Sequence, residues 1–116
     1  MSQKGNEIKR KGGFTMTRIS DLTFSYHCIN DRAERINLID NYIGWGQIIK
    51  ERYYQQCYHC FTDTGIMLVL TQDKKKIITL YLVDEKEAGI AFHGKIPKSL
   101  HRKISYHIAM GWVNLK

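Results

Sequence analysis

The chain has 116 residues, of which 43% are hydrophobic and 25% are charged, and its formal net charge is +7. This length is typical of one domain and suffices to bury a core, and the composition excludes a wholly disordered chain. No apolar run approaches the roughly 20 residues that a membrane-spanning helix requires.

The three cysteines are an odd number in a chain with no recognisable signal peptide. This usage predicts free thiols and a cytoplasmic location. Cys57 and Cys60 have the spacing of a zinc-binding pair, with Cys28, His27 or His59 as the remaining candidate ligands. In a strand, however, residues three apart point to opposite faces, which disfavours chelation. We therefore expect no metal and no cofactor, and keep a zinc-stabilised interaction module as the third hypothesis.

Basic residues are concentrated at the two ends of the chain. Residues 1–18 hold five basic residues and one acid, a net charge of +4, and residues 95–116 hold five basic residues and no acid. Residues 19–94 carry a net charge of −2. Such ends favour contact with phosphate groups or with an acidic partner. The sequence thus predicts nucleic-acid contacts by Lys9, Arg10, Lys11, Lys95, Lys98, Arg102 and Lys103.

The first part of the chain predicts a tail followed by two helices. Residues 1–15 are polar, basic and glycine-containing, and we expect a flexible tail there, before a single domain over residues 16–116. A helix is predicted over residues 31–41, because the segment opens with two acids at the spacing of a capping box. The glycines of residues 44–46 end it, and a second helix is predicted over residues 47–55.

The second part of the chain has the pattern of strands. The run Cys57 to Val83 predicts a β-hairpin closed by a polar turn at Asp73 to Lys76, and residues 89–93 predict a fourth, shorter strand. After Pro97, which suits the start of a helix, residues 98–110 predict a basic helix. The predicted fold is α+β, with two N-terminal helices packed on a three- to four-stranded antiparallel meander and a C-terminal basic helix.

One group of residues near the first predicted helix has the chemistry of RNA cleavage. Such cleavage, when it uses no metal, needs a base for the 2′-hydroxyl, an acid for the leaving oxygen and cations for the phosphate. His27 can exchange a proton near neutral pH, and the guanidinium groups of Arg32 and Arg35 can bind phosphate. The alternative explanation is that both arginines pair with acids on a solvated helix face.

The middle of the chain resembles the small ribonuclease superfamily that contains barnase, colicin nuclease domains and RelE-type toxins. The likeness is to short bacterial and phage domains with a histidine, a double-arginine helix and an Ile-Thr-x-Tyr strand. The matching pieces, within residues 24–83, are Ser25-Tyr26-His27, Arg32-Ala33-Glu34-Arg35, Thr64-Gly65-Ile66 and Ile77-Ile78-Thr79-Leu80-Tyr81.

This resemblance implies a sheet face that carries RNA-cleaving residues. It makes His27 the acid or base, and Arg32 and Arg35 the groups that bind phosphate. It also places Thr79 and Tyr81 along the cleft. Members of such a superfamily share the fold without sharing the chemistry, so the roles are hypotheses about this chain.

Two functions remain open at this point. The leading hypothesis is a nucleic-acid-directed phage or bacterial protein with a RelE- or barnase-like fold that cleaves RNA without a metal. The alternative is a non-catalytic protein that holds nucleic acid, or inhibits a nuclease, through its basic ends. RNA or another nucleic acid is the expected partner, an antitoxin or a nuclease is a candidate protein partner, and no membrane is involved.

Overall fold

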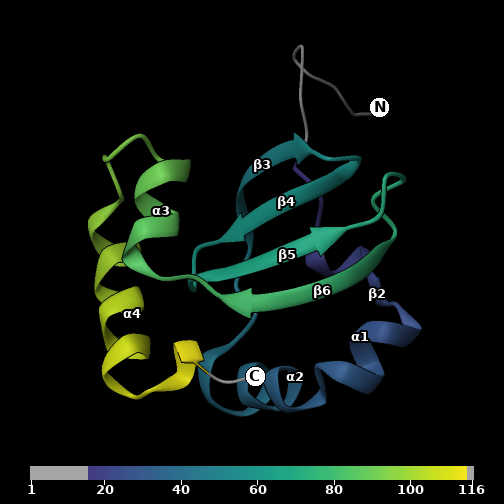
Figure 1. The fold of residues 1–116 in the computed structure, drawn as a ribbon, viewed down its shortest axis with the longest axis horizontal. Helices are drawn as coiled ribbons and strands as arrows, with labels where there is room; N and C mark the ends of the chain where they lie inside the picture. The colour runs from purple at the N-terminus through teal and green to yellow at the C-terminus, as the bar shows by residue number, and fades with distance from the viewer. Residues whose placement is uncertain (1–15, 115–116) are drawn as a thin grey trace, which may run out of the picture.

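The computed structural model describes residues 16–114 (Figure 1). Their elements in chain order are η2 (Ile19–Asp21), β2 (Thr23–Phe24), α1 (Tyr26–Asp31), α2 (Ala33–Leu38), the π-helical η3 (Ile39–Ile43), β3 (Ile48–Tyr54), β4 (Cys57–Thr62), β5 (Ile66–Leu70), β6 (Lys76–Leu82), α3 (Glu85–Ala91), α4 (Lys98–Ala109) and η4 (Trp112–Asn114). The predicted α+β class is confirmed. The predicted tail, with Lys9, Arg10 and Lys11, lies outside the described residues. None of the helices within residues 16–114 is long and apolar enough to cross a membrane.

One five-stranded sheet organises the fold, in the order β2-β6-β5-β4-β3. Strands β3 to β6 are an antiparallel meander, and β2 joins β6 as a parallel pair, so the sheet is mixed rather than wholly antiparallel. The predicted hairpin turn is confirmed, since residues 71–75 connect β5 to β6. The run Cys57 to Val83 contains three strands, β4, β5 and β6, of which β5 and β6 form the hairpin closed by this turn.

Each face of the sheet buries its own hydrophobic cluster, because successive side chains of a strand alternate between faces. The first cluster packs under the N-terminal helices and consists of Cys28, Ile39, Ile48, Cys60, Ile66, Leu68, Leu70, Ile77, Leu80 and Leu82. The second packs under α3 and α4 and consists of Phe61, Met67, Val83, Ala88, Ala91, Leu100 and Ile104. Figure 1 shows α3 and α4 at one end of the strands, so they cover part of their face.

The helix predicted over residues 47–55 is wrong, because Ile48–Tyr54 forms the edge strand β3. Its Lys, Glu and Arg residues favour a helix, but pairing with β4 along six residue pairs overrides that weak preference. The turn between the two strands is Gln55-Gln56, with φ of 50° and 65°. Two-residue hairpin turns with positive φ usually contain Asn or Gly, so the sequence held no hairpin signal here.

The strand predicted over residues 89–93 is also wrong, because helix α3 occupies residues 85–91. Asp84 caps this helix, because its side chain accepts a hydrogen bond from the backbone N–H of Glu87. The Glu87 side chain in turn accepts one from the Asp84 backbone N–H. This reciprocal pair is a capping box, which starts a helix in the segment just before the predicted strand. Ala88 and Ala91 then bury the inner side of the helix.

The first helical segment begins earlier than predicted and is interrupted. Ser25 caps α1, since its hydroxyl accepts a hydrogen bond from the Cys28 backbone N–H at 3.1 Å, so the capping box predicted at Asp31 does not form. The chain leaves helical geometry at Arg32, with φ −127° and ψ 23°, before α2 begins. The C-terminal prediction is confirmed, because α4 spans Lys98–Ala109 directly after Pro97.

His107 holds the end of α4 in the core. Its side chain is buried, and its Nδ1 has no hydrogen-bond partner in the described part of the chain. The imidazole lies 5.8 Å from the Trp112 ring and next to Gly65, where a β-carbon would come within 3.4 Å of it. Burial, and then the positive charge of Lys103, lower the pKa of His107. The folded protein therefore keeps this ring neutral.

We expect His107 to make the protein less stable in mild acid. Its pKa is lower in the folded state than its ordinary value of 6.5, so the unfolded state binds more protons between the two values. The free energy of unfolding should therefore fall as the pH decreases below about 6.5 and through the lowered pKa. Urea unfolding between neutral and mildly acidic pH checks this. A His107→Leu variant should show a flatter pH dependence, and a slope equal to that of the wild type would contradict the explanation.

Candidate functional site

The sheet face that packs against α3 carries two rows of side chains. Each row contains one residue from each of four neighbouring strands. Register pairs across β3, β4, β5 and β6 place in the first row Lys50, Phe61, Met67 and Tyr81. They place in the second row Arg52, His59, Val69 and Thr79. Thr79 and Tyr81 therefore share a face, as the strand period predicted, and this face also holds basic residues from β3.

A pocket of about 190 Å³ lies where these rows meet α3. Its lining residues are Lys50, Arg52, Tyr54, His59, Phe61, Met67, Tyr81, Glu87, Ile90 and Ala91. Sites that enclose a whole drug-sized ligand usually measure roughly 300 to 1,000 Å³, so this pocket suits one group of a larger substrate. It combines an apolar floor with polar and basic side chains, the composition of a site that binds and orients a phosphate or a base.

His59 is the histidine of the pocket, and its surroundings shift its pKa. Burial, and then the positive charge of Arg52 on the neighbouring strand, lower the pKa of His59, and a hydrogen bond with the Tyr54 backbone opposes this only in part. A neutral imidazole carries one N–H and one free lone pair. Since the ring is neutral near pH 7, it can accept a proton there, as a general base must.

The two cations of β3 are held by aromatic rings. The Arg52 guanidinium lies 5.1 Å from the centroid of the Tyr54 ring, and the Lys50 ammonium lies 5.4 Å from the centroid of Phe92. The Tyr54 ring in turn meets the His59 ring edge to face, with centroids 5.8 Å apart. Contacts of this kind restrict long side chains and leave their charges available to an anion.

Tyr81 closes the other side of the pocket. Burial first, and then the carboxylate of Glu87, raises the pKa of the Tyr81 hydroxyl to about 12, and this hydroxyl is hydrogen-bonded to Glu87. The phenol therefore stays neutral at physiological pH and acts as a hydrogen-bond group rather than as a base. Of the residues that the resemblance placed along a cleft, Tyr81 is the one that lines this pocket.

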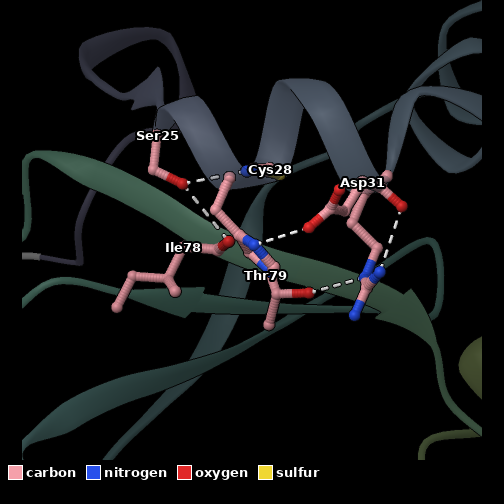
Figure 2. A network of polar contacts seen from close by, with 7 residues as sticks. Ser25, Cys28, Asp31, Ile78 and Thr79 are labelled. Carbon is pink, nitrogen blue, oxygen red and sulfur yellow. Dashed lines mark hydrogen bonds and ion pairs between the residues drawn. The ribbon is translucent and has the colours of Figure 1, made fainter.

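Ser25, Arg32 and Arg35 lie along the outer edge of β6. Strand β2 pairs with β6 only at the start of β6, so later carbonyl groups on that edge need other donors. Ser25 donates to the Ile78 carbonyl at 3.3 Å, and Arg35 Nη1 donates to the Leu80 carbonyl at 2.8 Å. Figure 2 shows Ser25 and Ile78 in this network.

Arg32 reaches the same edge from the junction of α1 and α2. Its Nε donates to the Thr79 hydroxyl at 3.1 Å, a contact drawn in Figure 2, and its Nη1 donates to the Asp31 carbonyl at 3.0 Å. Together with Arg35 it attaches the helices to the sheet, which gives both arginines a structural explanation. Their role in binding phosphate stays a prediction.

His27 lies apart from the pocket lining. Its Nδ1 is 2.8 Å from the Asp31 carboxylate, one helical turn later on α1, and both side chains are about half exposed. Thr79 and Tyr81 are part of β6, and Arg32 contacts this strand through Thr79. His27 instead lies on the outer surface of α1. Its catalytic role also stays a prediction.

The predicted basic residues of the C-terminal region are exposed. Lys95 lies between α3 and α4, and Lys98 and Arg102 lie on α4. Lys103, also on α4, donates to the Asp63 carbonyl at 3.2 Å.

Cys57 and Cys60 differ in burial. Cys60 is fully buried in the cluster under the N-terminal helices, whereas Cys57 is half-buried at the end of β4 that pairs with Tyr54, and both are free. Within residues 16–114, no group of three or more His, Cys, Asp or Glu side chains could hold a metal ion.

Three pocket residues, Lys50, Arg52 and Glu87, were missed as site candidates, and His59 was considered only as a metal ligand. The alternation Lys50-x-Arg52-x-Tyr54 was visible, and in a strand it places three side chains on one face. Interpretation of that segment as a helix hid the pattern. His59 was noted in a predicted strand, but its neighbour Arg52 was assigned to a different element.

A comparison with known proteins found no matching family model, no matching curated protein and no matching solved structure. The function is therefore inferred from the side chains of the pocket.

Proposed function

We propose that this protein is a nucleic-acid-directed endoribonuclease that needs no metal ion, and that the pocket between β3, β4 and α3 is its active site. The observation that carries the proposal is the neutral imidazole of His59 beside the guanidinium of Arg52, with Lys50 in the same pocket. A base next to fixed cations is what cleavage at a phosphodiester requires.

The reaction follows from these positions. The free ring nitrogen of His59 takes the proton of the ribose 2′-hydroxyl, and the 2′-oxygen forms a bond to the adjacent phosphorus. The bond from phosphorus to the 5′-oxygen breaks, and that oxygen leaves with a proton from water. The proton on His59 then neutralises the resulting hydroxide. Lys50 and Arg52 stabilise the charge that develops on the phosphate oxygens.

The products are a 2′,3′-cyclic phosphate and a 5′-hydroxyl end. Tyr81, neutral and bonded to Glu87, orients the substrate by hydrogen bonding. The resemblance agrees with this site in one respect, because it expects Tyr81 along a cleft on the sheet, although it assigns the acid or base to His27. The position of Tyr81 in the lining of the pocket supports that part of the proposal.

Arg52→Gln should slow RNA cleavage by roughly 100-fold, because a charged donor to the phosphate is lost. The assay uses end-labelled, unstructured RNA in excess EDTA, with detection of the cyclic phosphate end. Arg18→Gln is the matched control, since Arg18 is exposed and pairs with Asp21 at 3.4 Å outside the pocket. Equal rates for both variants would contradict the assignment of the site.

The alternative function gives a different result in the same assay. A non-catalytic protein would leave RNA intact under every condition while binding it with an affinity that falls steeply with salt. The basic side chains exposed on α4 favour such binding, and this second function would then replace the first.

A further inference from the structure

The surface at the end of α4 gathers aromatic rings from three elements. Trp112 of η4 lies between Tyr42 of η3, at 6.3 Å, and Tyr106 of α4, at 5.8 Å between ring centroids. Tyr42 is 75% exposed and Tyr106 is 58% exposed, whereas Trp112 packs partly against the core. The rings are therefore anchored on one side and open to a partner on the other.

Positive charge accompanies these rings. Arg102 and Lys103 precede Tyr106 by four and three residues on α4, the spacing at which side chains of a helix are neighbours. No acidic residue occurs between residues 98 and 109. The lining of the pocket comes from β3 to β6 and α3, so this surface is separate from it. Figure 1 shows the end of α4 away from β3.

We propose that Tyr42, Tyr106 and Trp112, with Arg102 and Lys103, form a stacking platform for unpaired bases of single-stranded nucleic acid. Aromatic rings stack on any base, and cations beside them follow the phosphate backbone. A duplex keeps its bases stacked internally, so it offers these rings no face. The inference rests on the proposed function for its nucleic-acid substrate, and adds that the substrate is single-stranded and reaches a second surface.

The positive charges of Arg102 and Lys103 favour single-stranded nucleic acid over a purely apolar partner. A partner with a purely apolar surface would cover Tyr42 and Tyr106 but would leave Arg102 and Lys103 without anions. A single strand satisfies both parts of the surface, since its bases meet the rings while its phosphates meet the cations.

Binding of a labelled oligodeoxyadenylate of about twelve nucleotides tests the platform, because it spans several bases and has no 2′-hydroxyl to react. In fluorescence anisotropy, Tyr42→Ala and Tyr106→Ala should each weaken binding roughly 5- to 100-fold. The phenylalanine variants at both positions should bind like the wild type, because they keep the ring. Tyr26→Ala is the matched control, since this 82% exposed tyrosine lies on α1.

The cations have a separate readout. Arg102→Gln with Lys103→Gln should reduce the slope of log affinity against log salt by about 0.7 for each charge. A duplex of the same sequence should bind more weakly than the single strand, and an RNA strand with 2′-O-methyl groups should bind like the DNA strand.

Several results would overturn the platform. Alanine variants that keep their circular dichroism and bind like the wild type would do so. A loss of self-association in Tyr42→Ala, measured by light scattering, with unchanged oligonucleotide affinity would instead assign the surface to a dimer. The two proposals also fail separately. If cleavage depends on Arg52 but not on Tyr42 or Tyr106, the proposal of the active-site pocket stands and that of the platform fails. If oligonucleotides bind through the platform but no RNA is cleaved, only the proposal of the platform stands.

Discussion

Replacing His59 with alanine should reduce the rate of RNA cleavage by about 100-fold or more, with the fold retained. In the proposed reaction its half-buried ring is the general base. Burial and the charge of Arg52 lower its pKa, so the ring is neutral at physiological pH and can accept a proton. The side chain lies outside the two hydrophobic clusters, and its removal should cost little stability. RNA binding should change less than the cleavage rate, because Lys50 and Arg52 remain.

Single-turnover cleavage of end-labelled RNA in EDTA measures this effect. His101→Ala is the matched control, since His101 is exposed on α4 and pairs with Glu85 at 2.7 Å. The hypothesis based on resemblance predicts the large loss in His27→Ala instead. A loss confined to His27→Ala would move the catalytic base from the pocket to α1, and unchanged cleavage in His59→Ala would refute the role of His59.

Replacing Lys74 with methionine should lower the free energy of unfolding by about 3 kcal/mol. The Lys74 ammonium lies 2.8 Å from Glu51 Oε1, and the Glu51 side chain is only 3% exposed. The other carboxylate oxygen accepts a hydrogen bond from the Thr17 backbone at 2.6 Å. Burial by itself raises the pKa of Glu51, but the hydrogen bonds from Lys74 and Thr17 outweigh it and lower that pKa. Without Lys74, a buried carboxylate is left without this cation.

Urea unfolding followed by circular dichroism gives the comparison. Lys75→Met is the control, because Lys75 is the exposed neighbour in the same turn and should change stability by less than about 0.5 kcal/mol. The double variant Glu51→Gln with Lys74→Met should recover most of the loss, since it removes the charge together with its partner. If the single Lys74 variant matches the Lys75 control, the pair does not stabilise the protein.

The strands rich in β-branched residues could be predicted, because a short apolar run of such residues between polar turns favours a strand over a helix. The buried strands β5 and β6 are apolar runs bounded by polar turns, and α4 follows Pro97 as a basic amphipathic helix. These elements follow from local chemistry, and the pairing of Thr79 and Tyr81 on one face follows from the period of a strand.

The rest of the fold depends on tertiary pairing that local sequence does not specify. The segment of β3 contains good helix formers, and only its pairing with β4 makes it a strand. The parallel addition of β2 to β6 involves two residue pairs, too few to leave a pattern. Arg32 and Arg35 have the composition of a phosphate site, yet the unpaired edge of β6 gives them structural partners.

The residues of the pocket, like strand β3, could not be predicted because they depend on the pairing of β3 with β4. Lys50, Arg52 and His59 are close only because β3 and β4 pair in one register, with Arg52 opposite His59. A one-residue shift of that register would send Lys50 and Arg52 to the other face. The sequence predicted RNA-cleaving chemistry at His27, Arg32 and Arg35, whereas the register of an edge strand brings together the residues of the proposed site.

An NMR titration with a dinucleoside phosphate that contains 2′-deoxyribose tests most directly whether the pocket binds the substrate. This ligand is short, and it cannot react through a 2′-hydroxyl. If the pocket binds the substrate, the largest shifts should fall on Lys50, Arg52, Tyr54, His59 and Tyr81. Shifts confined to Tyr26 through Arg35, with β3 and β4 unchanged, would contradict it.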